Sequence, residues 1–240
     1  MATIAIIGQD GSGKTTISNM ILEKIPLPFK YIYMGRNVQS GNFNLPTSKL
    51  IYALKVKKYI KKHNLKSSDK NQKLSLHEID DNMNVDSRGK IGATLRLMNR
   101  FAEEWYRLII SKYFQIRGKV ILYDRHFVFD YALDKLDKYK NNDRITDKIH
   151  RWTLDYLYEK PDLILFLYAP AEVLYARKGE ASIEYIDARN NTFLNLGKKM
   201  PNFFIIDASQ PVEKVFNDVK EKILASVPQR FLQRDQFIDS

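Results

Sequence analysis

The stretch GQDGSGKTT, from Gly8 to Thr16, contains the residue types and spacing best suited to chemistry in this sequence. Gly8, four further residues and then Gly13-Lys14-Thr15 satisfy the phosphate-loop pattern. Glycines let successive backbone N–H groups turn toward phosphate oxygens at a helix N-terminus, where the helix dipole also favours anions. The pattern therefore predicts a nucleotide-phosphate site formed by Gly8, Gly11, Ser12, Gly13, Lys14, Thr15 and Thr16.

The side chains of this loop have distinct expected roles. Lys14 can reach the β- and γ-phosphates of a nucleotide, and the Thr15 hydroxyl can ligate Mg²⁺. Asp10 is unusual because an acid in a loop that binds anions is electrostatically unfavourable unless it has a role of its own. The alternative for Asp10 is a turn-forming residue that bonds its own backbone.

Strands and helices alternate along the chain. Short, nearly continuous apolar runs predict five strands, at residues 3–8, 29–34, 119–123, 162–168 and 203–207. Helical patterns are expected at about 14–25, 48–63, 90–117, 144–158, 171–178, 182–197 and 211–225. This order predicts an α/β fold, a five-stranded parallel sheet with helices on both faces. The 240 residues form one domain with a helical insertion at about 37–89.

Composition limits the classes of partner. There are 39 basic and 28 acidic residues, a net charge of +11, which favours anionic partners such as phosphates. The sequence has no cysteine, so thiol and zinc–thiolate chemistry are excluded. It shows no charged-then-apolar leader and no apolar run near the ~20 residues that span a bilayer. A soluble, cytoplasmic protein is the expectation.

Three blocks of the sequence resemble thymidylate kinases. The loop GQDGSGKTT is similar to that family's G-x-D-G-x-G-K-T-T, and GKVILYDRH ends a strand in an Asp-Arg pair, as the family's does. The segment FFIIDASQPVEKV resembles the family's last strand, loop and helix, whose loop, here at Ala208, packs on the adenine. The resemblance implies a P-loop kinase fold, an ATP-dependent phosphotransferase that uses Mg²⁺, and a homodimer.

The resemblance also implies roles for Asp124 and Arg125, the Asp-Arg pair of the segment GKVILYDRH. Phosphoryl transfer requires two substrates held in line and stabilisation of the transferred charge. Lys14, Arg125 and Mg²⁺ would stabilise that charge, and Asp124 would hold a magnesium-bound water. Asp10 would face the acceptor and the water shell of the metal. The alternative for Asp124 and Arg125 is a surface ion pair at the end of a strand.

A basic segment at about 176–192 corresponds in position to the lid of nucleoside and nucleotide kinases. The arginines of that lid close over the transferring phosphate. Arg177 and Lys178 are the best candidates for this role, with Arg189 behind them. The alternative is an ordinary solvated helix surface.

The helix at 90–117 has a charged face formed by Arg96, Arg100, Glu103 and Arg107. In thymidylate kinases the helix before the Asp-Arg strand lines the acceptor pocket with such a face. The position of the family's pocket arginine is occupied here by Glu103. The charged face of the family's helix is therefore present, but its arginine is not. The alternative is an exposed stripe of ion pairs. On the opposite side we expect a core-facing set: Thr94, Met98, Phe101, Trp105 and Leu108.

The segments expected to bind the phosphoryl acceptor depart from the family's sequence pattern. In place of the family's Arg-Glu-Pro-Gly-Gly run the chain reads YMGRNVQSG, where Arg36 could still meet an acceptor phosphate. HFVFDYALD, which begins at His126, replaces the family's pyrimidine-reading Ser and Tyr-Gln. We expect an anionic acceptor, first a nucleoside monophosphate such as dTMP. A sugar, glycan or lipid-linked acceptor, or a deoxynucleoside, is the alternative.

The insertion contains a basic amphipathic helix at 49–66, KLIYALKVKKYIKKHNLK. Such a helix can lie on an anionic membrane surface or hold an anionic substrate, or it can be a packed helix with a solvated lysine face. The basic charge also allows a nucleic-acid-binding or regulatory P-loop NTPase. The absence of a recognisable nucleic-acid module argues against that class, so nucleic acid is not an expected partner.

Overall fold

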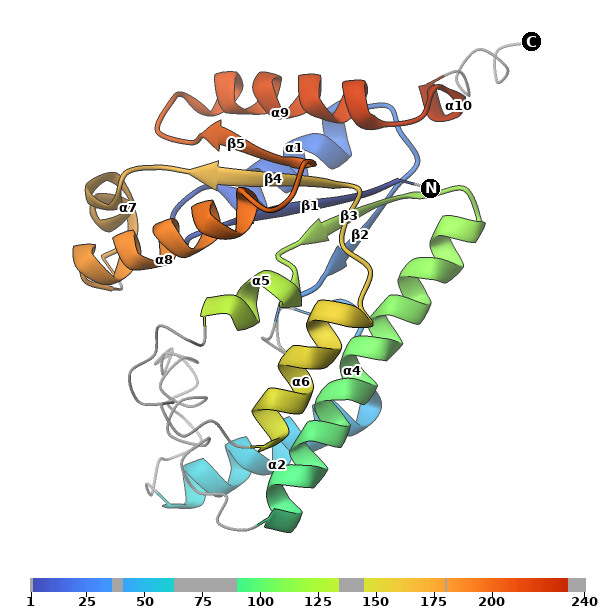
Figure 1. Cartoon of the computed structure of the whole chain (residues 1–240), viewed down its shortest axis with the longest axis vertical. Coiled ribbons are helices and arrows are strands. Elements are labelled where there is room, and N and C mark those ends of the chain that lie inside the picture. The colour runs from blue at the N-terminus through green and yellow to red at the C-terminus, as the bar shows by residue number, and fades with distance from the viewer. Residues whose placement is uncertain (1, 36–40, 63–89, 134–144, 180, 233–240) are drawn as a thin grey trace.

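The fold is described here from a computed structural model, which covers residues 2–35, 41–62, 90–133, 145–179 and 181–232. Its sheet has the strand order β2-β3-β1-β4-β5 (Figure 1). All neighbouring strands are parallel. The strands are β1 (Thr3–Gly8), β2 (Phe29–Tyr33), β3 (Val120–Asp124), β4 (Leu163–Tyr168) and β5 (Phe203–Asp207). The predicted five-stranded parallel sheet is confirmed.

Helices cover both faces of the sheet, as its continuous apolar strands predict. Alternate residues of β1 lie in two separate cores, Ile4 and Ile6 in one and Ala5 and Ile7 in the other. The first core is closed by α1 (Lys14–Lys24), α7 (Ala171–Lys178) and α9 (Val212–Ser226). The second lies under α4 (Lys90–Ile116), α5 (Phe127–Ala132), α6 (Ile145–Tyr156) and α8 (Ile183–Gly197).

The seven predicted helices are present, and two short helices were not predicted. One is α5, which follows His126 directly, and the other is α10 (Gln229–Leu232). At six and four residues they are too short to show a helical period. The α5 segment is also aromatic, and Phe127 and Phe129 are buried in the second core.

The long helix α4 is turned the opposite way to the sequence prediction. Met98 and Trp105, predicted to face the core, are 61% and 49% exposed, whereas Arg107 is buried. Arg107 binds backbone carbonyls of the segment that follows β2, and these bonds hold the polar side of the helix inward. Of the other residues predicted on the core side, one is exposed and two are half-buried: Thr94, Phe101 and Leu108, respectively.

The insertion at 37–89 is represented by residues 41–62, because 37–40 and 63–89 lie outside the described residues. Its helix α2 (Pro46–Lys62) is joined to α4 where Asn99 donates to Ser48 at 3.3 Å. Leu50 and Leu54 of α2 are exposed. The membrane or substrate role predicted for 49–66 stays a prediction. None of the helices in the described ranges is long and apolar enough to span a bilayer.

Candidate active site

The site lies at the carboxyl edge of the sheet, where β1 and β3 end side by side. Ile6 of β1 is opposite Asp124 of β3 in the register. β1 also pairs with β4 on its other side, so the chain order reverses at β1. In open parallel sheets, ligands bind outside the carboxyl ends of the strands at such a switch point. The loop Gly8–Thr16 and the pair Asp124-Arg125 leave the sheet there.

The loop after β1 has the backbone that its glycines predict. Gly8 has a φ of 155°, and a Cβ there would lie 2.6 Å from the Ser12 hydroxyl oxygen and 2.8 Å from the Leu167 carbonyl oxygen. Gly13, with a φ of 85°, precedes the first residue of α1. The first N–H groups of a helix have no partner within it, so this end of α1 is suited to bind phosphate oxygens.

Lys14 is buried at the mouth of the loop. Its Nζ donates to the Gln9 carbonyl oxygen at 2.6 Å and lies 3.9 Å from Asp10 Oδ1. Burial, and next the positive charge of Arg125, lower the pKa of Lys14 to about 8. The negative charge of a bound polyphosphate would therefore favour the protonated form of Lys14 at this position.

Asp10 pairs with Arg125 rather than only shaping its own turn. Arg125 Nη2 donates to Asp10 Oδ1 at 2.5 Å. Burial alone would raise the pKa of Asp10, but Arg125, Lys14 and Lys178 together lower it to about 2. Arg125 has a φ of 62°, an uncommon conformation outside glycine that is frequent at functional sites. Asp10 and Arg125, which were each predicted as site residues, thus meet in one ion pair.

Asp124 is held by a residue that the sequence prediction missed. The Tyr31 hydroxyl donates to Asp124 Oδ2 at 2.7 Å, and the carboxyl group is buried. Tyr33 is opposite Asp124 in the register, so Tyr31, two residues earlier, has its side chain on the same face. Strand register was the signal that could have identified Tyr31. The raised pKa of Tyr31, caused by burial and by Asp124, keeps its proton available for this bond.

A magnesium ion fits the residues at this edge. Thr15 is exposed at the first turn of α1, and Asp124 lies at the end of the neighbouring strand. Mg²⁺ is commonly held by one or two protein oxygens together with substrate phosphates and waters. Within the described ranges no group of three or more His, Cys, Asp or Glu residues could hold a metal by itself. Thr15 and Asp124 supply few oxygen ligands, which suits a metal ion that binds together with a nucleotide.

Arg177 lies between the phosphate loop and the segment after β5. Its Nη1 donates to the Ala208 carbonyl oxygen at 2.9 Å and to the Gly11 carbonyl oxygen at 3.4 Å. A Cβ at Gly11 would lie 3.6 Å from the Cβ atoms of Arg177 and Lys178, so the end of α7 packs on the loop. This contact joins the two segments predicted to hold ATP. The closing motion of residues 176–192 stays a prediction.

The predicted acceptor residues do not all converge. His126, predicted as an acceptor contact, is 1% exposed, and its ring lies among Tyr123, Phe127 and Phe129. Burial lowers its pKa to about 3, so it is neutral. Arg100 lies over the Tyr131 ring at 5.1 Å. Arg36 and the side chain of Arg96 lie outside the described residues.

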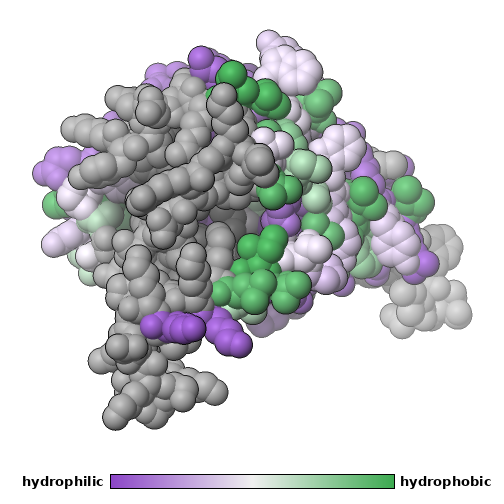
Figure 2. Space-filling model, turned by 90° about the horizontal axis from the view of Figure 1, so that it is seen from below, coloured by the Kyte–Doolittle hydropathy of each residue, from purple (hydrophilic) through white to green (hydrophobic). Residues whose placement is uncertain are grey.

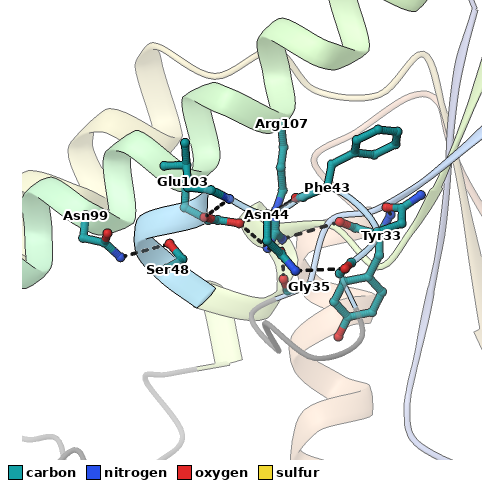
Figure 3. Close-up of polar contacts among 11 residues, drawn as sticks. Tyr33, Gly35, Phe43, Asn44, Ser48, Asn99, Glu103 and Arg107 are labelled. Atoms are coloured by element: carbon teal, nitrogen blue, oxygen red, sulfur yellow. Dashed lines mark hydrogen bonds and ion pairs between the residues drawn. The ribbon is translucent and has the colours of Figure 1, made fainter. Parts of the chain in front are cut away.

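Glu103 and Arg107 form a structural cluster beside this region (Figure 3). Glu103 Oε1 accepts from Arg107 at 2.8 Å, and Oε2 accepts from the Leu45 N–H at 3.0 Å. Arg107 also donates to the carbonyl oxygens of Gly35 at 2.7 Å and Phe43 at 3.1 Å. Both residues therefore position the segment between β2 and α2, and both oxygens of Glu103 have partners within the protein.

Comparisons with known proteins agree with this arrangement. No family model matches the chain. It is 22% identical over 230 residues to a thymidylate kinase of Thermosipho africanus (strain TCF52B), a match that covers 90% of this chain and 94% of that protein.

Two solved structures of deoxyadenosine kinase from M. mycoides share the fold. The one with the products dCMP and a flexible dCDP has a TM-score of 0.51 and 17% identity, and covers 93% of this chain and 99% of that chain. The one with dATP has a TM-score of 0.50 and 20% identity, and covers 93% of this chain and 100% of that chain. The sequence match and the shared fold confirm the resemblance that the three blocks indicated: the chain is similar to thymidylate kinases and has a P-loop kinase fold.

Proposed function

We propose that the chain transfers the γ-phosphate of ATP, in the presence of Mg²⁺, to a nucleoside monophosphate such as dTMP, and that it acts as a homodimer. One observation carries the proposal. Lys14, Asp10 and Arg125 meet at the carboxyl edge of the sheet, beside Asp124, although Asp10 and Arg125 are 115 positions apart in the sequence. The curated relative that matches 90% of the chain is a thymidylate kinase, which favours a monophosphate acceptor.

The residues divide into a donor group and an acceptor group. The glycine loop and Lys14 hold the phosphates of ATP, while Arg177 keeps the Ala208 segment beside the loop. Thr15 and Asp124 would hold Mg²⁺, which when bound would neutralise phosphate charge. Arg125 stabilises the oxygens of the transferred group, and Asp10 orients both Arg125 and the acceptor.

A deoxynucleoside acceptor is the second candidate, favoured by two observations. The two solved structures described above are of a deoxyadenosine kinase. The acceptor side also has less positive charge than the sequence predicted, because His126 is buried and neutral. An uncharged acceptor requires fewer cations than a monophosphate does.

The test is an ATP-consumption assay with Mg²⁺ across nucleoside monophosphates, deoxynucleosides and acidic sugars. The Lys14→Ala variant supplies the background rate, since it lacks the lysine that contacts the phosphates. Turnover of dTMP or another monophosphate at the highest kcat/KM supports the proposal. Turnover of deoxynucleosides alone would replace it by the second candidate, and turnover of sugars alone would overturn both.

A further inference from the structure

The helix α2 differs in charge from the other helices of the chain. Its 17 residues include six lysines and no aspartate or glutamate. Among the described helices of eight or more residues it is the only one without an acidic residue. The positive charge of α2 is therefore not neutralised by acids of the helix itself.

One side of α2 is packed against the protein. Ser48 is buried and accepts a hydrogen bond from the Asn99 side chain of α4, and Tyr52, one turn later, is half-buried. Directly before the helix, the Leu45 N–H donates to Glu103 Oε2 of α4 at 3.0 Å. These contacts with α4 determine which side of α2 faces outward.

The outward side of α2 carries both apolar and basic residues. Four of them follow one another at steps of four, three and four, which places them on one face of the helix: Leu50, Leu54, Lys57 and Lys61. Leu50 is 61% exposed and Leu54 is 59% exposed, and the two lysines are exposed as well. Ile51, beside Leu50, is also exposed. These five residues are called the α2 face below.

The α2 face has the composition of an interaction surface. α2 lies at the lower end of the molecule in Figure 1, and Figure 2 looks onto that end, where hydrophobic residues are exposed with hydrophilic ones among them. Leucines exposed singly are common on protein surfaces. Two leucines one turn apart, next to an isoleucine and in line with lysines, instead indicate contact with a surface that is both apolar and anionic.

We propose that the α2 face binds the surface of a membrane that contains anionic phospholipids. The leucines and the isoleucine enter the boundary between headgroups and acyl chains, and the lysines lie at the level of the lipid phosphates. Lysine stems are apolar, so they can lie along acyl chains while the ammonium groups stay in water. Attachment of this kind becomes stronger with both buried apolar area and attraction to anionic lipids, and the α2 face supplies both.

The apolar residues favour a membrane over a nucleic acid as the partner. A nucleic acid would bind the lysines through its phosphates, but its backbone offers the leucines no apolar surface like that of acyl chains. Unpaired bases stack on aromatic side chains, and none of the five residues of the α2 face is aromatic. The membrane contact is independent of which acceptor the active site takes.

Cosedimentation with lipid vesicles tests the contact. The full chain is mixed with vesicles of phosphatidylcholine alone, or of equal parts of phosphatidylcholine and phosphatidylglycerol. It should sediment with the anionic vesicles only, and added salt should release it because salt screens the lysines. A labelled DNA duplex is the parallel probe. Equal binding to both kinds of vesicle, binding to DNA without binding to vesicles, or binding to neither would overturn the proposal.

Charge substitutions test the location of the contact. The double variant Lys57→Gln/Lys61→Gln should lower the partition coefficient on anionic vesicles by ~10-fold or more. Lys198→Gln/Lys199→Gln removes the same charge from an exposed pair after α8 and should bind as the wild type does. Both variants should keep the far-UV circular dichroism spectrum of the wild type. If the control lost as much binding as the α2 variant, the contact would not lie on α2.

A fluorescent label tests whether the apolar residues enter the membrane. The chain has no cysteine, so Leu54→Cys introduces a single thiol for an environment-sensitive fluorophore. Anionic vesicles should shift the emission of this label to shorter wavelength, whereas the same label at Leu22→Cys, an exposed position of α1, should not respond. The proposal fails if the protein sediments with vesicles but the Leu54→Cys label does not shift. It also fails if that label is already shifted without vesicles, because protein would then cover the face.

Discussion

Arg125 Nη2 lies 2.5 Å from Asp10 Oδ1, although the two residues are 115 positions apart in the sequence. The bond connects the loop after β1 to the residue after β3 and brings the guanidinium beside the phosphate loop. Arg125 has a positive φ, a conformation that costs of the order of 1–3 kcal/mol for most residues and is held by the surrounding structure. Its N–H donates to the Ile6 carbonyl oxygen at 3.0 Å, which fixes this backbone against β1.

Replacing Arg125 by alanine should lower kcat by ~10³-fold or more, because an arginine in phosphoryl transfer stabilises charge in the transition state. The KM for ATP should change much less. The measurement is steady-state kinetics with the best acceptor. Arg117→Ala, at an exposed arginine after α4, is the control and should behave as the wild type. A variant that loses thermal stability but keeps kcat would assign Arg125 a structural role only.

The lowered pKa of Lys14 predicts proton uptake on nucleotide binding. At a pKa of about 8 the free protein carries a partly neutral Lys14 above pH 8, and bound phosphates favour its charged form. Calorimetric titration of an ATP analogue at about pH 8.5, in buffers of different ionisation enthalpy, should show uptake of a proton by Lys14. Uptake should diminish toward pH 6.

The Lys14→Arg variant is the control for this titration, because a guanidinium stays protonated at every pH used. It should show less proton uptake than the wild type at the higher pH. Equal uptake by the two proteins would mean that the titrating group is not Lys14.

Most of the fold followed from the sequence because its signals are local. Apolar runs located all five strands within two residues, and the glycine pattern located the loop. The orientation of α4 did not follow, since periodicity shows that a helix has an apolar face without showing that this face lies against the sheet. Met98 and Trp105 were predicted in the core for this reason and are exposed.

The residues that support the site were harder to predict than those at its centre. Recognisable motifs contain Lys14, Asp10, Asp124 and Arg125. Tyr31, in contrast, bonds to Asp124 from the neighbouring strand, and the two residues are 93 positions apart in the sequence. His126 follows the Asp-Arg pair in sequence, but it is the N-cap residue directly before α5, and its ring lies in the aromatic core. Contacts of this kind depend on register and packing, which no single segment encodes.

Tyr31→Phe should raise the Mg²⁺ concentration required for half-maximal activity by ~10-fold, since partners of a metal-side carboxylate commonly affect metal affinity by 10–100-fold. The phenyl ring keeps its packing, so the thermal midpoint should change little. Tyr175→Phe, at an exposed tyrosine of α7, is the matched control. An unchanged Mg²⁺ dependence would show that the Tyr31–Asp124 bond has no part in positioning the carboxylate.

Arg107→Met should lower the free energy of unfolding by about 3–5 kcal/mol, because it leaves Glu103 partly buried without its partner. It also removes the donors to the Gly35 and Phe43 carbonyl oxygens. Urea unfolding measures the effect, with Arg117→Met as the control. A loss below about 1 kcal/mol, the range of surface ion pairs, would contradict the positioning role.

The most direct test of the central claim follows the γ-phosphate itself. Wild-type protein, Lys14→Ala and Arg125→Ala are incubated with γ-labelled ATP, Mg²⁺ and dTMP, and the label is located by chromatography. The wild type should move the label into a nucleoside diphosphate, and each variant should do so at least ~10²-fold more slowly. Label that appears only as inorganic phosphate, or equal transfer by the three proteins, would contradict the assignment of Lys14 and Arg125 to phosphoryl transfer.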